Sequence, residues 1–171
     1  MTDGRVGGPD DERRSGRDRA TVVAAFAVVL HLALVVCAFG FVSLLADVDV
    51  VARAGTGALV GPAMIAAAVI VTGVALLRDA RRPASRVRQR SWPVVVGVAV
   101  LLAYVLSGAA LVALEEGAVF EGVAFAGSTL ASAFPYLAGA IAAVVAVAYS
   151  AVADARPGAV PRWPWERDEQ D

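Results

Sequence analysis

Long apolar runs separated by short polar segments set the pattern of this sequence. Four runs of 23 to 27 residues contain no acidic residue and no arginine. They cover residues 20–46, 54–77, 92–114 and 129–153. A helix crosses the hydrocarbon core of a bilayer with about 20 residues, and helices satisfy their own backbone groups at that depth. The runs also lack the period-2 alternation of barrel strands. The pattern therefore predicts an all-α fold, a four-helix transmembrane bundle made of two helical hairpins over residues 20–153.

Prolines mark where the second and fourth helices begin. Pro62 follows a glycine-rich segment, and Pro135 lies several residues inside the fourth run. Proline suits the first turn of a helix, where its missing N–H is not needed. The second helix is therefore expected to begin near Gly61. In the fourth run, Pro135 either marks a later start of the helix or kinks it.

Both ends of the chain are polar. Residues 1–19 hold five arginines and five acidic residues with few apolar ones, so a disordered N-terminal tail is expected. Residues 154–171 hold three prolines and end in acidic residues, which predicts a second tail without a core. Trp163 and Trp165 either dip back into the headgroup layer or form a short motif for a partner.

The arginines are distributed unevenly, and this predicts the topology. Fourteen of the fifteen lie in the two tails or in the loop between the second and third runs, and Arg53 is the exception. Positive residues in short loops mark the cytoplasmic side. Both termini and the middle loop are therefore expected in the cytoplasm of a multi-pass plasma-membrane protein. The middle loop contains Arg78, Arg81, Arg82, Arg86, Arg88 and Arg90.

The middle-loop arginines also suit the anionic headgroups of lipids, which are attracted by basic clusters beside a membrane. Nucleic acid is not expected as a partner, because the loop has no aromatic platform or recognised module. Trp92 is the nearest aromatic residue, and it fits an interfacial anchor.

Composition narrows the chemistry further. Apolar residues make up 58% of the chain, which exceeds the roughly 45–50% of soluble domains. Cys37 is the single cysteine, so an intrachain disulfide is excluded. No nucleophile–base pair, metal cluster or phosphate-binding loop is recognisable, so no catalytic residue, metal or cofactor is predicted. Five carboxylates in the other two loops either bind a cation or form a hydrated rim, and the rim is the favoured interpretation. They are Asp47, Asp49, Glu115, Glu116 and Glu121.

His31 is the one ionisable side chain in the first run apart from the cysteine thiol. It lies 11 residues after Ala20, about 16 Å into the span, and Tyr104 lies 12 residues after Trp92, about 18 Å into its own. Both spans run outward, so the two polar groups should lie at nearly one level. We predict that His31 points into the bundle, stays neutral and bonds Tyr104 or, as the second choice, Ser107.

Small residues recur every four positions along the fourth run, from Gly127 through Ala131, Pro135 and Gly139 to Ala143. Such a face lets helices approach closely in a membrane. It predicts tight packing within one chain or in a homo-oligomer. The leading functional prediction is a non-enzymatic protein that acts through packing or a membrane partner. The alternatives are a small transporter or channel subunit working as an oligomer, with His31 as its intramembrane ionisable group, and a membrane enzyme using the loop carboxylates.

Three segments resemble a family of uncharacterised four-span integral membrane proteins from actinobacteria. They are Val36–Asp47, Gly61–Met64 and Trp163–Asp168. The resemblance implies a bacterial plasma membrane. It implies no activity and carries no catalytic residue over.

Overall fold

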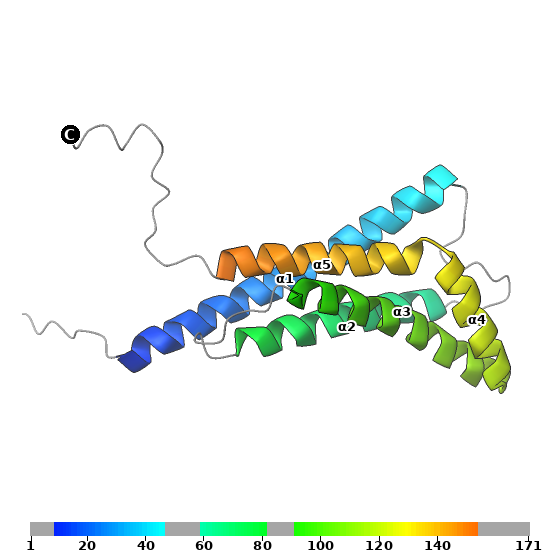
Figure 1. The fold of residues 1–171 in the computed structure, drawn as a ribbon, viewed down its shortest axis with the longest axis horizontal. Helices are drawn as coiled ribbons and strands as arrows, with labels where there is room; N and C mark the ends of the chain where they lie inside the picture. Colours follow the sequence, from blue (N-terminus) through cyan, green and yellow to red (C-terminus); the bar gives the residue numbers. More distant parts are fainter. Residues whose placement is uncertain (1–8, 47–58, 82–90, 154–171) are drawn as a thin grey trace, which may run out of the picture.

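Helices dominate the computed structural model, which describes residues 9–46, 59–81 and 91–153 (Figure 1). This part of the chain forms five helices and no strand. The helices are α1 (Pro9–Ala46), α2 (Val60–Ala80), α3 (Trp92–Glu116), α4 (Val119–Ala131) and α5 (Phe134–Ala153). Four of them are long and apolar enough to cross a membrane: α1 over Asp18–Leu45, and all of α2, α3 and α5. The predicted all-α class and helical bundle are therefore confirmed.

The four long helices form a closed ring. α3 packs against α2 and α5, and α1 packs against the same two helices from the other side. The short helix α4 joins this ring at one end and packs mainly on α3. In Figure 1, α1 crosses α5 obliquely and α4 lies beside the C-terminal end of α3. Each long helix thus has two long neighbours, which leaves its remaining surface facing outward.

The helix ends follow from local sequence. Pro62 and Pro93 lie in the first turns of α2 and α3, where a missing N–H costs no hydrogen bond. α3 ends at Gly117, whose φ of 64° is left-handed. Glycine adopts that conformation without steric cost, so the chain can leave α3 and turn directly into α4.

The first helix is longer than the sequence pattern indicated. Residues 9–19 were expected to belong to a disordered tail, but α1 begins at Pro9. A proline in the first turn and the acidic residues that follow it favour a helix start, because negative charge is stabilised near a helix N-terminus. The apolar run therefore gave the length of the span and not the length of the helix. The expectation for residues 1–8 and for the tail after Ala153 lies outside the described residues.

The fourth run is divided between two helices. Thr129–Ala131 close α4, and the spanning helix begins only at Phe134. Ser132 between them is extended, with φ −87° and ψ 164°. Pro135 is therefore a first-turn proline of a later-starting helix, one of the two outcomes the sequence allowed. The predicted span over residues 129–153 was wrong at its start.

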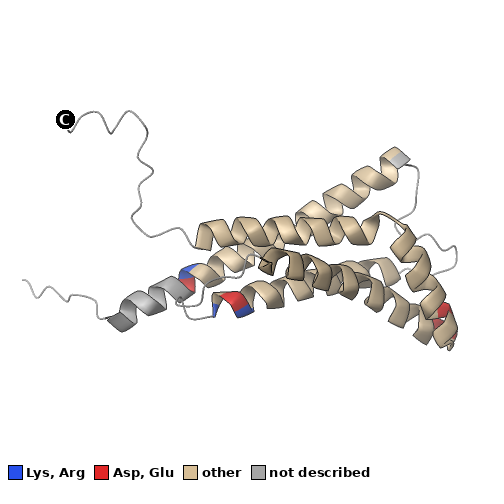
Figure 2. Cartoon of the chain, in the orientation of Figure 1, with Lys and Arg blue, Asp and Glu red and all other residues tan. Residues whose placement is uncertain are grey.

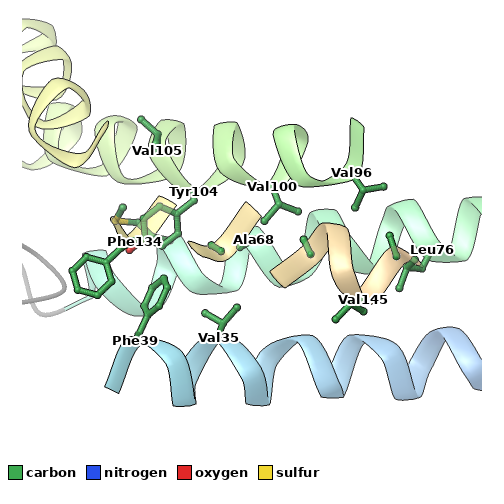
Figure 3. Packing of buried hydrophobic residues seen from close by; sticks show 14 of the residues in the cluster. Val35, Phe39, Ala68, Leu76, Val96, Val100, Tyr104, Val105, Phe134 and Val145 are labelled. Atoms are coloured by element: carbon green, nitrogen blue, oxygen red, sulfur yellow. The ribbon is translucent and has the colours of Figure 1, made fainter. Parts of the chain in front are cut away.

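The bundle has an apolar interior and an apolar exterior. Buried aliphatic and aromatic side chains from all five helices meet in one core, part of which is shown in Figure 3. Large apolar side chains also cover the outside, such as Phe26 of α1, which is 73% exposed, and Leu106 of α3 at 62%. An extensive apolar surface of this kind suits lipid and not water.

Charged residues lie only at the ends of the described spans (Figure 2). Asp18 and Arg19 near the start of α1 share one end of the bundle with Arg78 and Asp79 of α2. The acidic residues Glu115, Glu116 and Glu121 lie at the other end. The described arginines and the outer-loop carboxylates thus occupy opposite ends of the bundle.

Candidate functional site

The inward face of α1 carries His31 into the core. Residues on this face recur at intervals of three or four, which is the helical period. They are Ala24, Ala27, His31, Val35 and Phe39, all of them buried. His31 is 0% exposed, so the prediction that it points into the bundle is confirmed. Neither of its ring nitrogens has a hydrogen-bond partner among the described residues.

Tyr104 is the second unpartnered polar group in the core. It is also 0% exposed, and its hydroxyl has no hydrogen-bond partner in the described part of the chain. Its ring meets that of Phe39 edge-on, with the centroids 5.8 Å apart at 89°. In Figure 3, Phe39 rises from α1 toward Tyr104 on α3.

The predicted hydrogen bond between His31 and Tyr104 is therefore absent. Tyr104 lies at the level of Phe39, which is eight residues and about 12 Å further along α1 than His31. The depth estimate failed because it placed Ala20 level with Trp92, whereas counting twelve residues back from Phe39 puts the level of Trp92 near Ala27. Ser107, the second predicted partner, donates its hydroxyl to the carbonyl of Tyr104 at 3.0 Å, within its own helix.

Two polar residues of the core were missed by sequence reasoning, and both lie on α2. Thr72 is fully buried and donates its hydroxyl to the carbonyl of Ala68 at 3.0 Å. Asp79 is 7% exposed and lies two helical turns further toward the arginine-bearing end. The spacing contained the signal, since the buried positions of α2 repeat every four residues from Val60 to Leu76 and thus include Thr72.

The break between α4 and α5 is held by local hydrogen bonds. The backbone N–H and the hydroxyl of Ser132 both donate to the carbonyl of Thr129, at 3.0 and 2.7 Å. The Tyr136 hydroxyl reaches back across the break and donates to the carbonyl of Leu130 at 2.9 Å. These bonds satisfy carbonyls at the end of α4 that an uninterrupted helix would have satisfied itself.

The break lies where the fourth span begins, at the start of α5. Phe134, the first residue of α5, packs against Phe39 with ring centroids 5.0 Å apart. Phe39 in turn contacts Tyr104, which is twelve residues from either end of α3. At about 1.5 Å per residue, Tyr104 is about 18 Å from both ends of α3. The fourth span thus begins at Phe134, near an unpartnered hydroxyl.

The small residues of α5 form a close backbone contact with α3. A Cβ added to Gly139 would lie 2.8 Å from the carbonyl oxygen of Gly97 on α3, and one added to Gly97 would lie 2.7 Å from that of Gly139. Ala143 borders the same contact, at 3.2 Å from that Cβ position on Gly97. The prediction that Gly139 and Ala143 face another helix is therefore confirmed, and that helix belongs to the same chain.

The outer members of the predicted stripe are not part of this face. Gly127 and Ala131 belong to α4 and are exposed, and a Cβ on Gly127 would meet nothing within 4 Å. The extended Ser132 redirects the chain, so the four-residue period does not continue from α4 into α5. α4 uses Gly122 instead, whose added Cβ would lie 2.5 Å from the carbonyl oxygen of Ala109.

The remaining predicted residues lie at the rims or outside the described part. Arg78 and Arg81 are exposed at the end of α2. The arginines from Arg82 to Arg90, together with Asp47, Asp49, Trp163 and Trp165, lie outside the described residues. Within residues 9–46, 59–81 and 91–153, no three His, Cys, Asp or Glu side chains come close enough to hold a metal ion.

Comparison with known proteins places the chain in a family without assigning it an activity. No curated protein and no solved structure matches the sequence. A family model described as "Family of unknown function (DUF6121)" matches residues 12–171, which include all four spans. The chain therefore belongs to this family of unknown function.

Proposed function

We propose that this is a non-enzymatic multi-pass protein of a bacterial plasma membrane, which acts by presenting the lipid-facing surface of a closely packed bundle to a membrane partner. The inward faces of its helices pack against one another within the same chain. The contact between Gly97 and Gly139 carries the proposal, because it uses the closest-packing face of α5 inside one chain. A partner, or a second copy, must then bind through the outer faces.

The proposed orientation places both termini and the middle loop in the cytoplasm. Its support is the segregation of the arginines, together with the position of Glu115, Glu116 and Glu121 at the opposite end of the bundle. In this orientation the middle-loop arginines face the anionic cytoplasmic leaflet.

In-cell photocrosslinking tests the proposal directly. A photoreactive amino acid would replace Phe26, Leu106 or Val144, which are exposed on α1, α3 and α5. We expect a discrete protein adduct, either a dimer or a heterologous complex, from one of these faces and none from the control position Val35, which is fully buried. Adducts to lipid alone from all three faces would contradict a role in partner binding.

A second function, passage of a small solute or ion, is favoured by one specific feature. Two fully buried polar side chains in the core, His31 and Tyr104, have no partner among the described residues, and the fourth span begins near one of them. Ionisable and polar groups inside a membrane bundle commonly mark substrate or ion pathways. Flux into liposomes that contain the purified protein would distinguish this function from the first. The His31→Leu variant should abolish such flux and leave a partner adduct unchanged.

A further inference from the structure

We infer that His31 is a proton-binding site in the core, and that the bound proton separates the first half of the α1 span, residues 18–30, from α2 and α5. The second half, residues 32–45, stays in place. This site goes beyond both proposed functions and depends on neither. Three features of the structure support it: a buried imidazole without a partner, the absence of a counterion beside it, and unequal packing of the two halves of α1.

The imidazole of His31 is an unused proton acceptor. His31 is the single histidine of the chain, and it is 0% exposed. Neither ring nitrogen has a hydrogen-bond partner among the described residues. A neutral imidazole always keeps one nitrogen with a free lone pair. Histidine is also the side chain whose charge ordinarily changes between about pH 5 and pH 8, so a proton is the ligand that this group takes.

The helix α5 brings no charge to His31. The ring contact between Phe39 and Phe134 sets the register of α1 against α5, which run in opposite directions (Figure 1). His31, eight residues before Phe39, is therefore level with Ala142. Tyr149 is the one buried titratable residue of α5, and it lies seven residues further, about 10 Å along the helix.

The helix α2 brings no counterion to His31 either. A Cβ added to Gly73 would lie 3.5 Å from a side-chain carbon of Val28, so these two residues are level. Because α1 and α2 also run in opposite directions, His31 is level with Ile70. Asp79 is the one buried titratable residue of α2, and it lies nine residues from that level, about 13 Å. Among the described residues, an imidazolium at His31 would thus have no counterion within about 10 Å along the bundle axis.

A charged imidazole does not fit this closed core. An isolated charge in apolar surroundings costs far more than a neutral polar group. Tyr104 of α3 lies about 12 Å from His31 in the direction away from Asp79, and Cys37 of α1 is exposed, so neither compensates the charge. Proton binding therefore requires an open form in which water reaches the imidazole. This form binds one more proton than the closed form, so falling pH shifts the equilibrium toward it.

The packing of α1 determines which half opens. In the first half, the buried positions of the inward face are Ala24 and Ala27, whose side chains are small. In the second half they are Val35 and Phe39, and the ring of Phe39 packs edge-on against aromatic rings of α3 and α5. Burial of a large apolar side chain stabilises a contact more than burial of a methyl group. The first half is therefore the part that separates.

The first measurement follows the imidazole in the full-length protein, in lipid nanodiscs and without a histidine tag. Because the chain has one histidine, isotope-labelled histidine reports on His31 alone in an NMR titration. We expect the ring nitrogens to change from the neutral to the charged pattern in one reversible step between about pH 8 and about pH 5. An imidazole that stays neutral over this range overturns the inference.

Spin-label distances then test the coupling to α1. In a Cys37→Ser background, cysteines for labelling replace exposed residues in two pairs. Val22 and Val74 report on the first half against α2, and Phe41 and Leu59 report on the second half. Between about pH 8 and about pH 5, the first distance should lengthen by about 3 Å or more, since a water bonded to the imidazole needs that spacing, and the second should not change. Constant distances in both pairs, or equal changes in both, overturn the inference.

Two core variants provide the matched comparison. His31→Leu removes the proton acceptor and should abolish the change in the Val22–Val74 distance. Tyr104→Phe removes the other unpartnered polar group of the core and should leave the change as it is in the original protein. A change that persists in the His31→Leu variant places the titrating group elsewhere, for example at Asp79, and overturns the inference.

Discussion

Replacing Gly139 by alanine tests the contact that holds α3 against α5. The added Cβ would lie 2.8 Å from the carbonyl oxygen of Gly97 and 3.3 Å from the Cβ of Leu101. Carbon and oxygen atoms do not approach below about 3.0 Å without a shift, and here the nearer atom belongs to a backbone. A rotamer change cannot relieve the clash, so the two helices have to separate.

The magnitude follows from two opposing effects. Overpacking a closely packed interface costs about 1–3 kcal/mol, whereas alanine is a better helix former than glycine by about 1 kcal/mol. We therefore expect Gly139→Ala to lower the free energy of unfolding by up to about 2 kcal/mol. Gly139→Leu should lower it further, because its longer side chain has to enter the same contact.

Unfolding in a bilayer or in mixed micelles, at equilibrium, measures this difference. Gly40→Ala is the matched control, since Gly40 lies in α1 and a Cβ there would meet nothing within 4 Å. It should be neutral or stabilising by up to about 1 kcal/mol. The Gly97→Ala and Gly139→Ala changes should also be non-additive, because the separation that relieves one clash relieves the other. Equal stability of Gly139→Ala and Gly40→Ala would refute the close-contact argument.

Three further predictions use the same protein. His31→Leu should raise the free energy of unfolding by about 1–3 kcal/mol in the unfolding assay, because it removes a buried polar group without a partner; a loss of stability would show that the imidazole is bonded in the membrane. Gly122→Ala should detach α4 from α3, since the added Cβ would lie 2.5 Å from the carbonyl oxygen of Ala109; faster hydrogen exchange confined to α4 would confirm it, and unchanged protection would contradict it. Reporter fusions at Ala84 should be active only with a cytoplasmic reporter and fusions at Thr56 only with an exported one, and the reverse result would overturn the proposed orientation.

The membrane spans and their inward faces were within reach of sequence reasoning. The length of an apolar run fixes whether a helix can cross a bilayer, and the helical period fixes which residues share a face. His31 was accordingly placed in the core, and Gly139 was placed at a helix contact. Each inference depends only on the length and period of a single helix, which is why both were confirmed.

The failures concern relations between helices. The level of His31 relative to Tyr104 depends on how α1 slides along α3, and an apolar run does not specify that register. The stripe through Gly127 and Ala131 assumed one continuous helix. No residue between Thr129 and Phe134 is a strong helix breaker, and only Pro135 gave a local signal for a later helix start. The position of the break therefore depends on tertiary contacts, such as those of α4 with α3.

The unpartnered polar groups in the core allow a test of whether the bundle is purely structural or contains a functional site. Each buried polar atom without a partner costs about 1–3 kcal/mol, and the imidazole of His31 and the hydroxyl of Tyr104 both fall in this class. Their combined cost is a large part of the 5–15 kcal/mol that typically stabilises a folded domain. Leucine and phenylalanine would fill the same volumes without that cost. If the bundle served only to hold its helices together, removing these groups should improve it in every assay. The His31→Leu and Tyr104→Phe variants should therefore gain stability, and a gain in stability accompanied by a loss of solute flux would identify the core as a functional site.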